Sequence, residues 1–492
     1  MSLSNELPRA GQGSRVPFAS LIVSLVLVGT GMVTAPAFAA DANNPKGTLG
    51  ASGVGLNVVD NWINNGHQNS HIVGVETKGG VFAGEHLCSD FAKCDTSKID
   101  FFDTILLLPN CATSGDKSCV ESIEANVGGA WQKAVSIGQN TGPIVEANPK
   151  FNIPKAGGGG LWSVKDPASG NTISLFSHAD LSMKYQSNTK KFLADSIAVN
   201  IVPYVLDPSM VTNATVSEWV DSEGRTRVQN SGFSEDCIWS GATGCGVATG
   251  FGAISDLKVT LRVSSSIGGW LIGRVEKPNV SISAIDKTNS RITVAGAVVS
   301  VPKIFVEVPK AEGQAAENEA FPGSFSMGGV TNIRANYPNA PGAIDAFRTL
   351  AKDRSIGDYT AWSFGSYNDG SYCMRSNKGF QGFVSTNASV YQSNTPQFNS
   401  GFLTYQVAGY HFQSDGLTAN IGRYDMLMTD KLAKCIYGLK KSPTSATVQV
   451  VDDGKTQSIA TTVVSMKNGW LKLAAAGFTY SNKTIKVKLK TK

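Results

Sequence analysis

The alternation of apolar and polar side chains in the second half of the chain constrains its fold most strongly. The stretch Leu257–Ser264 alternates without a break, and Ile485–Leu489 places aliphatic residues on one side and lysines on the other. A period of two residues is typical of β-strands that bury one face. Charged residues make up only 16% of the 492 residues, which argues against long charged helices. We therefore expect a mainly β, antiparallel fold of several domains with few helices.

Two pairs of short strands follow one another near the middle of the chain. Leu257–Ser264 is followed by a turn and by Trp270–Val275, and a second pair lies within Val280–Val294. Strands joined by short turns at this spacing predict a β-meander. We assign the meander to residues 254–310, either as a unit of its own or as part of an irregular β-rich N-terminal domain at residues 40–253.

Helical signals are few. Pro341–Asp353 is the strongest candidate, because Pro suits the first turn of a helix and Ile344 and Phe347 recur at helical spacing. Lys310–Ala320 is rich in Ala, Glu and Gln and predicts an exposed helix or linker. We place a domain boundary there, followed by a β-rich domain with one short helix at residues 321–440.

The last part of the chain, residues 441–492, predicts four strands. The alternating segments are Ala446–Val451, Gln457–Met466, Trp470–Leu473 and Ile485–Leu489. Asp-Gly and Asn-Gly pairs between them suit tight hairpin turns. We expect one antiparallel four-strand module of the immunoglobulin-like or β-sandwich type. The lysines of its last strand either protect a sheet edge from aggregation, which is the more common use, or bind an anionic surface polymer.

Residues 1–39 have the pattern of an export signal. Arg9 and Arg15 precede the apolar stretch Leu21–Val33, and Ala37-Phe38-Ala39 supplies the small residues of a cleavage site. Gly and Thr interrupt the apolar run before it reaches the ~20 residues that span a bilayer, which argues against a retained anchor. We expect a signal peptide, no membrane span after its cleavage, and a protein that is secreted, extracellular or associated with the cell wall.

All eight cysteines follow this segment, and an even number in an exported chain predicts disulfides. Eight cysteines allow many pairings. Proximity along the chain favours Cys88–Cys94, Cys111–Cys119 and Cys237–Cys245, and leaves Cys373–Cys435 as a long-range link. A structural zinc site is disfavoured, because no two of these cysteines form a C-x2-C pair.

Charge and motifs exclude several functions. A net charge of +5 is too dilute for a nucleic-acid binder. No P-loop, EF-hand, G-x-G-x-x-G or G-x-S-x-G sequence is present, and Ser187–Lys190 matches S-x-x-K without its accompanying motifs. His67 and His71 lack the Glu of H-E-x-x-H, so we interpret them as ordinary loop or surface residues. We assign no catalytic residue, no metal and no cofactor.

The segment Asp358–Cys373 is dense in aromatic, hydroxyl and small residues. Flat amphipathic rings beside Asn and Asp suit recognition of sugars or peptides. The candidate ligand-binding residues are Tyr359, Trp362, Tyr367, Asp369 and Tyr372. The alternative is that Trp362 and Phe364 face the core from one strand, and the strand propensity of aromatic residues favours it.

Cys, Trp and Gly recur at turns and strand starts from about residue 235 onward. The motifs are Cys237-Ile238-Trp239 with Cys245, Gly268-Gly269-Trp270 with Gly273-Arg274, Cys435-Ile436-Tyr437-Gly438, Gly469-Trp470-Leu471 and Gly477-Phe478-Thr479-Tyr480-Ser481. Over roughly residues 235–492 they resemble segments of an uncharacterised family of large exported actinobacterial proteins. That family has no assigned activity, so the resemblance implies export from a Gram-positive cell and no catalytic residue.

Two functions remain open. The first is a non-catalytic binding or structural role at the cell envelope, with cell-wall glycan or another surface protein as the partner. The second is a secreted hydrolase that acts on glycan or peptidoglycan through a carboxylate pair assembled by the fold. Two carboxylates in a cleft, at least one with a raised pKa, would favour the hydrolase.

Overall fold

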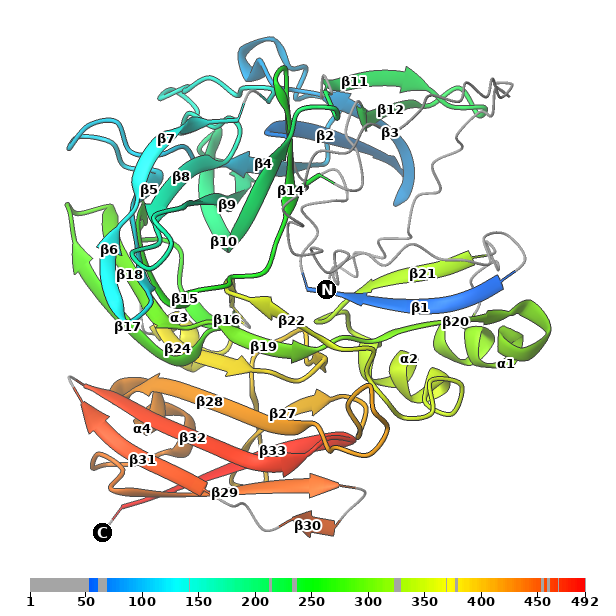
Figure 1. Ribbon diagram of the computed structural model, residues 1–492. Helices are drawn as coiled ribbons and strands as arrows, with labels where there is room; N and C mark the ends of the chain where they lie inside the picture. Colours follow the sequence, from blue (N-terminus) through cyan, green and yellow to red (C-terminus); the bar gives the residue numbers. More distant parts are fainter. Residues whose placement is uncertain are drawn as a thin grey trace. The chain divides into compact units, whose positions relative to one another are not determined.

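A computed structural model describes most of the chain beyond residue 52 (Figure 1). The described residues are 53–60, 69–140, 142–211, 215–231, 237–322, 329–368, 370–376, 379–452, 455–457, 461–467 and 469–491. The predicted signal peptide, His67, Asp369 and most of the two predicted C-terminal turns lie outside them. Within the described residues the fold is mainly β with several antiparallel sheets, as the alternation predicts.

The largest sheet has 15 strands. Its main path runs, in spatial order, through β3 (Val81–Leu87), β2 (His71–Lys78), β4 (Phe101–Leu107), β9 (Thr172–Gln186), β10 (Lys191–Asp207), β23 (Ser363–Tyr367), β16 (Gly269–Arg274), β24 (Phe380–Thr386), β28 (Ile421–Thr429), β32 (Trp470–Thr479) and β31 (Thr461–Lys467). Four strands attach beside this path: β7 (Val135–Gln139), β8 (Gly160–Lys165), β13 (Trp239–Gly241) and β14 (Gly244–Ala248). We call this the long sheet.

The remaining strands form smaller sheets. The five-stranded sheet contains β17 (Glu276–Ala284), β18 (Asn289–Ala297), β15 (Ile254–Ser264), β5 (Cys119–Val127) and β6 (Ala130–Lys133). The six-stranded sheet contains β25 (Val390–Tyr391), β26 (Gln397–Asn399), β27 (Phe402–Ala408), β33 (Asn482–Lys490), β29 (Ser445–Asp452) and β30 (Lys455–Gln457). A three-stranded sheet joins β20 (Phe305–Pro309), β1 (Gly53–Val59) and β21 (Gly329–Arg334), and two pairs join β11 (Thr215–Val220) to β12 (Thr226–Ser231) and β19 (Val299–Pro302) to β22 (Asp358–Ala361).

Helices are short and few among the described residues. They are the 3-10 turn Phe91–Lys93 and the α-helices α1 (Lys310–Ala320), α2 (Ala340–Phe347), α3 (Tyr372–Ser376) and α4 (Asp430–Tyr437). The hydroxyl of Thr429 accepts a hydrogen bond from the backbone N–H of Leu432 at the start of α4, and Gly438 ends it in the left-handed conformation. Both signals are local and mark where α4 begins and ends.

Of the two predicted helices, one has the predicted bounds and the other is shorter. The helix α1 has the predicted bounds, but Ala316 and Ala320 are buried, so it is not fully exposed. The helix α2 ends six residues before the predicted limit, because Lys352 and Asp353 have positive φ values of 55° and 52° and turn the chain away.

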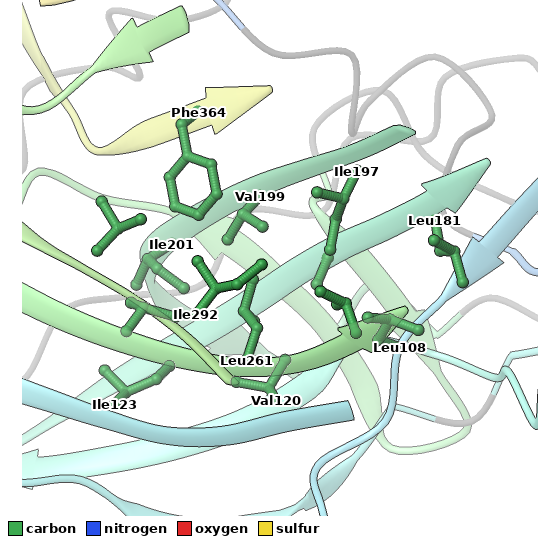
Figure 2. Packing of buried hydrophobic residues seen from close by; sticks show 14 of the residues in the cluster. Leu108, Val120, Ile123, Leu181, Ile197, Val199, Ile201, Leu261, Ile292 and Phe364 are labelled. Atoms are coloured by element: carbon green, nitrogen blue, oxygen red, sulfur yellow. The ribbon is translucent and has the colours of Figure 1, made fainter. Parts of the chain in front are cut away.

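One face of the long sheet packs against the five-stranded sheet. Figure 2 shows the side chains that meet there, including Leu181, Ile197, Val199 and Phe364 from the long sheet and Ile123, Leu261 and Ile292 from the five-stranded sheet. Full burial of such a side chain contributes about 1.5–3 kcal/mol. Successive strand residues point to opposite sides of a sheet. The residues next to Leu181 and Val199 in the chain therefore project from the other face of the long sheet.

That other face is apolar where the six-stranded and three-stranded sheets contribute to a second core. Trp270 and Ile272 of β16 pack there with Tyr405 of β27 and Val487 of β33. The strands β28, β32 and β31 and the strands β27, β33 and β29 thereby form two layers (Figure 1). The C-terminal region is a β-sandwich of these two sheets.

Two sequence predictions about strand pairing were wrong in detail. The predicted meander would pair β15 with β16, but β15 pairs with β18 and β5, and β16 lies in the long sheet. The four predicted C-terminal strands exist but do not form one sheet: β31 and β32 end the long sheet, while β29 and β33 belong to the six-stranded sheet. Alternation identifies a strand with one buried face but does not identify its neighbour.

Strand pairing also crosses each predicted domain boundary. The strand β5 pairs with β15, β10 pairs with β23, and β28 pairs with β32. The described residues between Gly53 and Thr491 accordingly belong to a single compact unit. The regions predicted at residues 40–253, 254–310, 321–440 and 441–492 are therefore parts of sheets that they share.

The predicted disulfide pairing is confirmed. Cys88–Cys94, Cys111–Cys119, Cys237–Cys245 and Cys373–Cys435 are bonded, and no cysteine is free. The first three close short loops, whereas the fourth joins α3 to α4 across 62 residues. Closing the longer loop removes more conformational entropy from the unfolded chain.

Candidate functional site

The predicted ligand-binding aromatics do not form one exposed surface. Tyr359 and Trp362 are buried, and the indole N–H of Trp362 donates to the carbonyl oxygen of Gly296 at 3.1 Å. Trp362 therefore faces the core, as the alternative interpretation held. Tyr367 is half-buried and its hydroxyl accepts a hydrogen bond from Asn336, while Tyr372 is 74% exposed.

A polar surface lies instead on the long sheet, opposite the core of Figure 2. Cross-strand partners project to the same side of a sheet. Asp180 of β9 pairs with Ala198 of β10, which pairs with Gly365 of β23. Two residues along, Asn200 pairs with Ser363. We define the polar face as Asp103, His178, Asp180, Ser182, Ala198, Asn200, Ser363, Gly365 and Tyr367.

Solvent reaches much of the polar face. Ala198 is exposed, and Asp180, Asn200 and Ser363 are half-buried. On the opposite side of the same strands, Val199 has no exposed surface. The sheet is thus packed on one side and partly open on the other, and its open side carries amide, hydroxyl and carboxylate groups.

Asp103 joins the polar face from β4. It precedes Leu107, the partner of Asp180, by four residues, and an even separation keeps both on one side of the strand. Asp103 is exposed whereas Asp180 is half-buried. Two carboxylates with different access to water therefore share this surface.

The environment of Asp180 favours its neutral form. Burial raises the pKa of Asp180 to about 7, and the charge of Asp103 adds to the rise. The backbone N–H of Leu106, which donates to Asp180 Oδ1 at 3.3 Å, and the charge of Arg334 oppose it. A carboxyl group with a pKa near 7 can both donate and accept a proton at neutral pH.

His71 adds an imidazole near Asp103. It pairs with Ile105, two residues from Asp103, and its Nδ1 lies 2.9 Å from the carbonyl oxygen of Asn69. Burial lowers the pKa of His71, although the Asn69 carbonyl, Asp103 and Glu85 oppose this. The prediction of a loop or surface histidine is wrong for His71, which is a buried residue of β2.

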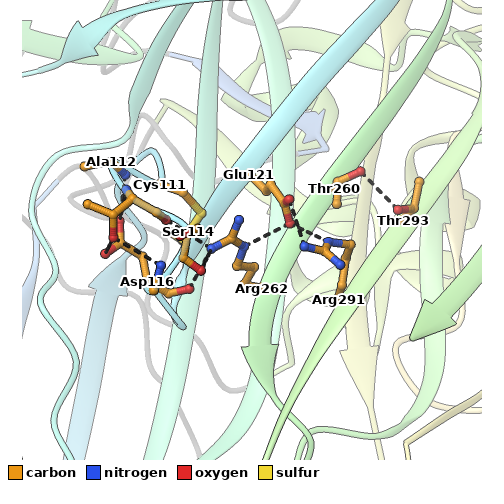
Figure 3. A network of polar contacts seen from close by, with 12 residues as sticks. Cys111, Ala112, Ser114, Asp116, Glu121, Thr260, Arg262, Arg291 and Thr293 are labelled. Carbon is orange, nitrogen blue, oxygen red and sulfur yellow. Dashed lines mark hydrogen bonds and ion pairs between the residues drawn. A yellow bond between two sulfur atoms is a disulfide. The ribbon is translucent and has the colours of Figure 1, made fainter. Parts of the chain in front are cut away.

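A second carboxylate, Glu121 of β5, has the opposite environment (Figure 3). Its Oε2 accepts hydrogen bonds from Arg262 Nε at 2.9 Å and from Arg291 Nε at 2.7 Å. The bonds from Arg262 and then Arg291 lower the pKa of Glu121 to about 2. Glu121 therefore stays charged at any physiological pH and serves to position the two guanidinium groups.

Arg262 uses its remaining donors to hold the loop closed by the Cys111–Cys119 disulfide. Its Nη1 donates to the carbonyl oxygens of Thr113, Ser114 and Asp116 at 2.8–3.1 Å (Figure 3). A disulfide and an arginine thus fix the same loop on the five-stranded sheet. We assign this cluster a structural role.

The third notable carboxylate is Asp60, at the end of β1. Arg274 has no exposed surface, and its Nε and Nη2 donate to the carboxylate of Asp60 at 2.9–3.0 Å. Arg274 also donates to the carbonyl oxygens of Thr386 and Ala388. This buried pair fastens β1 to the centre of the fold.

Sequence analysis missed the polar face because its members come from strands far apart in the chain. Around Asp180, the polar residues His178, Asp180 and Ser182 alternate with the apolar residues Ala179 and Leu181. The sequence of β9 alone therefore indicates that one of its sides is polar. Nothing local connects it to Asp103 or Ser363.

Comparison with known proteins adds no assignment. No known family model matches the chain, and a search of curated proteins finds no similar sequence. The resemblance to exported actinobacterial proteins stays a prediction. Among the described residues, no group of three His, Cys, Asp or Glu side chains is placed to hold a metal ion, and none of their helices is long and apolar enough to span a bilayer.

Proposed function

We propose that this protein is exported and binds a ligand at the cell envelope through the polar face. The observation that carries the proposal is the contrast between the two sides of β9 and β10. Val199 and Leu181 are packed into a core on one side, whereas Asn200 and Asp180 keep part of their surface exposed on the other. A protein that needed these strands only for stability would gain from covering both sides.

The four disulfides support the exported location. All eight cysteines are paired, and disulfides persist in oxidising compartments outside the cytoplasm. Attachment to the wall then requires a binding surface, since we expect no membrane span after cleavage of the signal peptide.

The chemistry of the polar face favours a hydroxyl-rich ligand. Asn200 and Tyr367 both donate and accept hydrogen bonds, and Asp103 accepts them. A glycan presents both donors and acceptors along an extended chain, so cell-wall glycan is the ligand we propose. Another surface protein is the alternative partner.

Co-sedimentation with isolated cell walls tests the proposal. Ala198→Arg places a long side chain on the polar face without removing a core contact, because Ala198 is exposed. Ala284→Arg at an exposed position of β17 is the matched control. We expect the wild-type protein and Ala284→Arg to sediment with the walls and Ala198→Arg to remain in solution. Equal sedimentation of all three, or of none, would overturn the proposal.

The pair Asp103 and Asp180 favours a second function, hydrolysis of a glycan on the same surface. Glycosidases use two carboxyl groups, one of which donates a proton to the leaving oxygen. Protonated Asp180 would donate that proton as the glycosidic C–O bond breaks. Asp103 would accept a proton from the water whose oxygen bonds to the anomeric carbon. Cleavage of each glycosidic bond would thus consume one water molecule.

Release of reducing ends from purified peptidoglycan or wall glycan tests the hydrolase. Turnover by the wild-type protein that disappears in Asp180→Asn and in Asp103→Asn is the expected result for this second function. Wall binding without any turnover would exclude it and leave the binding role in place.

A further inference from the structure

We propose that the outward side of the six-stranded sheet binds an anionic wall polymer along a row of lysines. This site goes beyond the proposed glycan-binding function, because it lies on a different sheet from the polar face. The row consists of Lys486, Lys488 and Lys490 of β33, and we call this surface the lysine face.

The position of β33 removes the common explanation for these lysines. Lysines often protect an edge strand from pairing with another molecule. The strand β33 is not an edge, since β27 pairs with one side of it and β29 with the other. Edge protection, which the sequence favoured, is therefore wrong for this strand, and the lysines have no such role to fulfil.

Burial alternates along β33 and separates the two sides of the sheet. Ile485, Val487 and Leu489 are buried in the second core. Lys488 and Lys490 are exposed and Lys486 is half-buried. Residues two apart on a strand are about 6.6–6.8 Å apart, so the three lysines leave the backbone of β33 on one side at a regular interval.

The neighbours of the row leave its positive charge unbalanced. Lys486 pairs across the sheet with Thr404 and Gln449. The other outward positions of the three central strands, as far as the structure describes them, include no Asp or Glu: they are Phe402, Thr404, Gln406 and Ala408 of β27, Asn482 and Thr484 of β33, and Ser445, Thr447, Gln449 and Val451 of β29. None of the three lysines forms an ion pair with the described residues.

Further positive charge lies in the segment that leads into β29. Lys440 and Lys441 are exposed, and the first residue of β29, Ser445, pairs with Lys490. Positive charge is thus also present in the chain segment beyond the end of the row. A cationic surface without acidic neighbours attracts polyanions over several ångströms, and the attraction weakens as salt increases.

The shape of the lysine face favours a linear polymer. A membrane surface site combines basic residues with exposed apolar side chains that enter the bilayer, but the ring of Phe402 lies under Lys488, whose Nζ is 5.4 Å from its centre. A single-stranded nucleic acid needs aromatic platforms for its bases, and Phe402 is the one aromatic residue among the outward positions named above. Hydroxyl and amide groups beside the lysines instead suit a polymer with alternating charged and hydroxyl groups.

Binding of polygalacturonate, with neutral dextran as the uncharged control, tests the proposal. The test variant is the full-length protein with Lys486→Gln, Lys488→Gln and Lys490→Gln. The matched control is Lys98→Gln, Lys155→Gln and Lys287→Gln, which removes the same charge from exposed positions elsewhere. We expect wild-type protein and control to bind polygalacturonate and not dextran, with affinity reduced about tenfold or more in the test variant.

The dependence on salt makes the test specific to the row. Each lysine that displaces a counterion contributes to the slope of log affinity against log salt, so the slope should fall by roughly 2 to 3 in the test variant. Equal loss in the control variant, or tighter binding to vesicles of anionic lipid or to a single-stranded oligonucleotide, would overturn the proposal. Ala198→Arg should bind polygalacturonate like the wild type, so this site and the polar face can fail separately.

Discussion

Glu121 and Asp180 are both carboxyl groups on β-strands, yet their environments push their pKa values in opposite directions. Two arginines donate to Glu121 and lower its pKa to about 2. Burial beside Asp103 raises the pKa of Asp180 to about 7. The first arrangement stabilises the fold at neutral pH and the second weakens it. A protein tends to retain such a weakness where the group is needed for a task other than folding.

Asp60 shares one property with Glu121 and one with Asp180. It has an arginine partner as Glu121 does, and its side chain is only 6% exposed. Comparing the three carboxylates therefore separates the effect of a cationic partner from the effect of burial.

The largest expected effect is the loss of the buried partner. Arg274→Met leaves the Asp60 carboxylate buried without its guanidinium, and we expect the free energy of unfolding to fall by about 3–5 kcal/mol. Urea unfolding at pH 7 measures it. Arg274→Met combined with Asp60→Asn should recover part of the loss, because the isolated charge is gone. A loss below about 1 kcal/mol in the single variant would contradict the burial of this pair.

The next effect has the opposite sign. The raised pKa of Asp180 means that ionisation favours the unfolded chain as the pH rises from about 4 to about 7. Asp180→Asn should therefore raise the free energy of unfolding at pH 7.5 by about 1–3 kcal/mol, less than the full shift implies because the residue is half-buried. The gain should shrink toward pH 4. A loss of stability at pH 7.5 would show that Asp180 is a stabilising residue like Glu121.

Glu121→Gln should weaken the fold by about 1–2 kcal/mol at pH 7, a value reduced from the full pKa shift because 23% of the side chain is exposed. The folded pKa lies below the unfolded one, so the wild type holds this stability above pH 4.5 and loses it as the pH falls toward 2. Unfolding curves of both proteins should converge between pH 4.5 and pH 2. Parallel curves over that range would contradict the lowered pKa.

The smallest effect is expected at an ordinary surface pair on the same sheet as Glu121. Lys258 Nζ lies 2.8 Å from Glu124 Oε1, and both side chains are at least 32% exposed. Lys258→Gln should change the free energy of unfolding by less than about 0.5 kcal/mol. A larger change would mean that the exposed fraction of a side chain does not predict how much the three carboxylates above contribute to the free energy of unfolding.

Local sequence signals predicted much of the architecture. Three of the four disulfides followed from short separations, the bounds of α1 followed from composition, and Leu257–Ser264 followed from alternation. Each of these depends on residues close together in the chain. Ser187–Lys190, which matches S-x-x-K without its accompanying motifs, is the short turn that joins β9 to β10.

The sequence did not predict which strands pair when they lie far apart in the chain. Trp270–Val275 reads as the return strand of a hairpin, but β16 pairs with β23 and β24 instead. In the aromatic segment, the favoured alternative for Trp362 was a position in the core, and the side chain packs there. The candidate site itself depends on β4, β9, β10 and β23 meeting, and no property of one strand reveals that.

The pairing of β1 has a consequence for how the chain can fold during synthesis. Val54 pairs with Val308 on one side and with Gly329 on the other. The first described strand therefore has no partner until β20 (Phe305–Pro309) has been synthesised, and both of its partners are present only after Arg334. Such distant contacts slow folding.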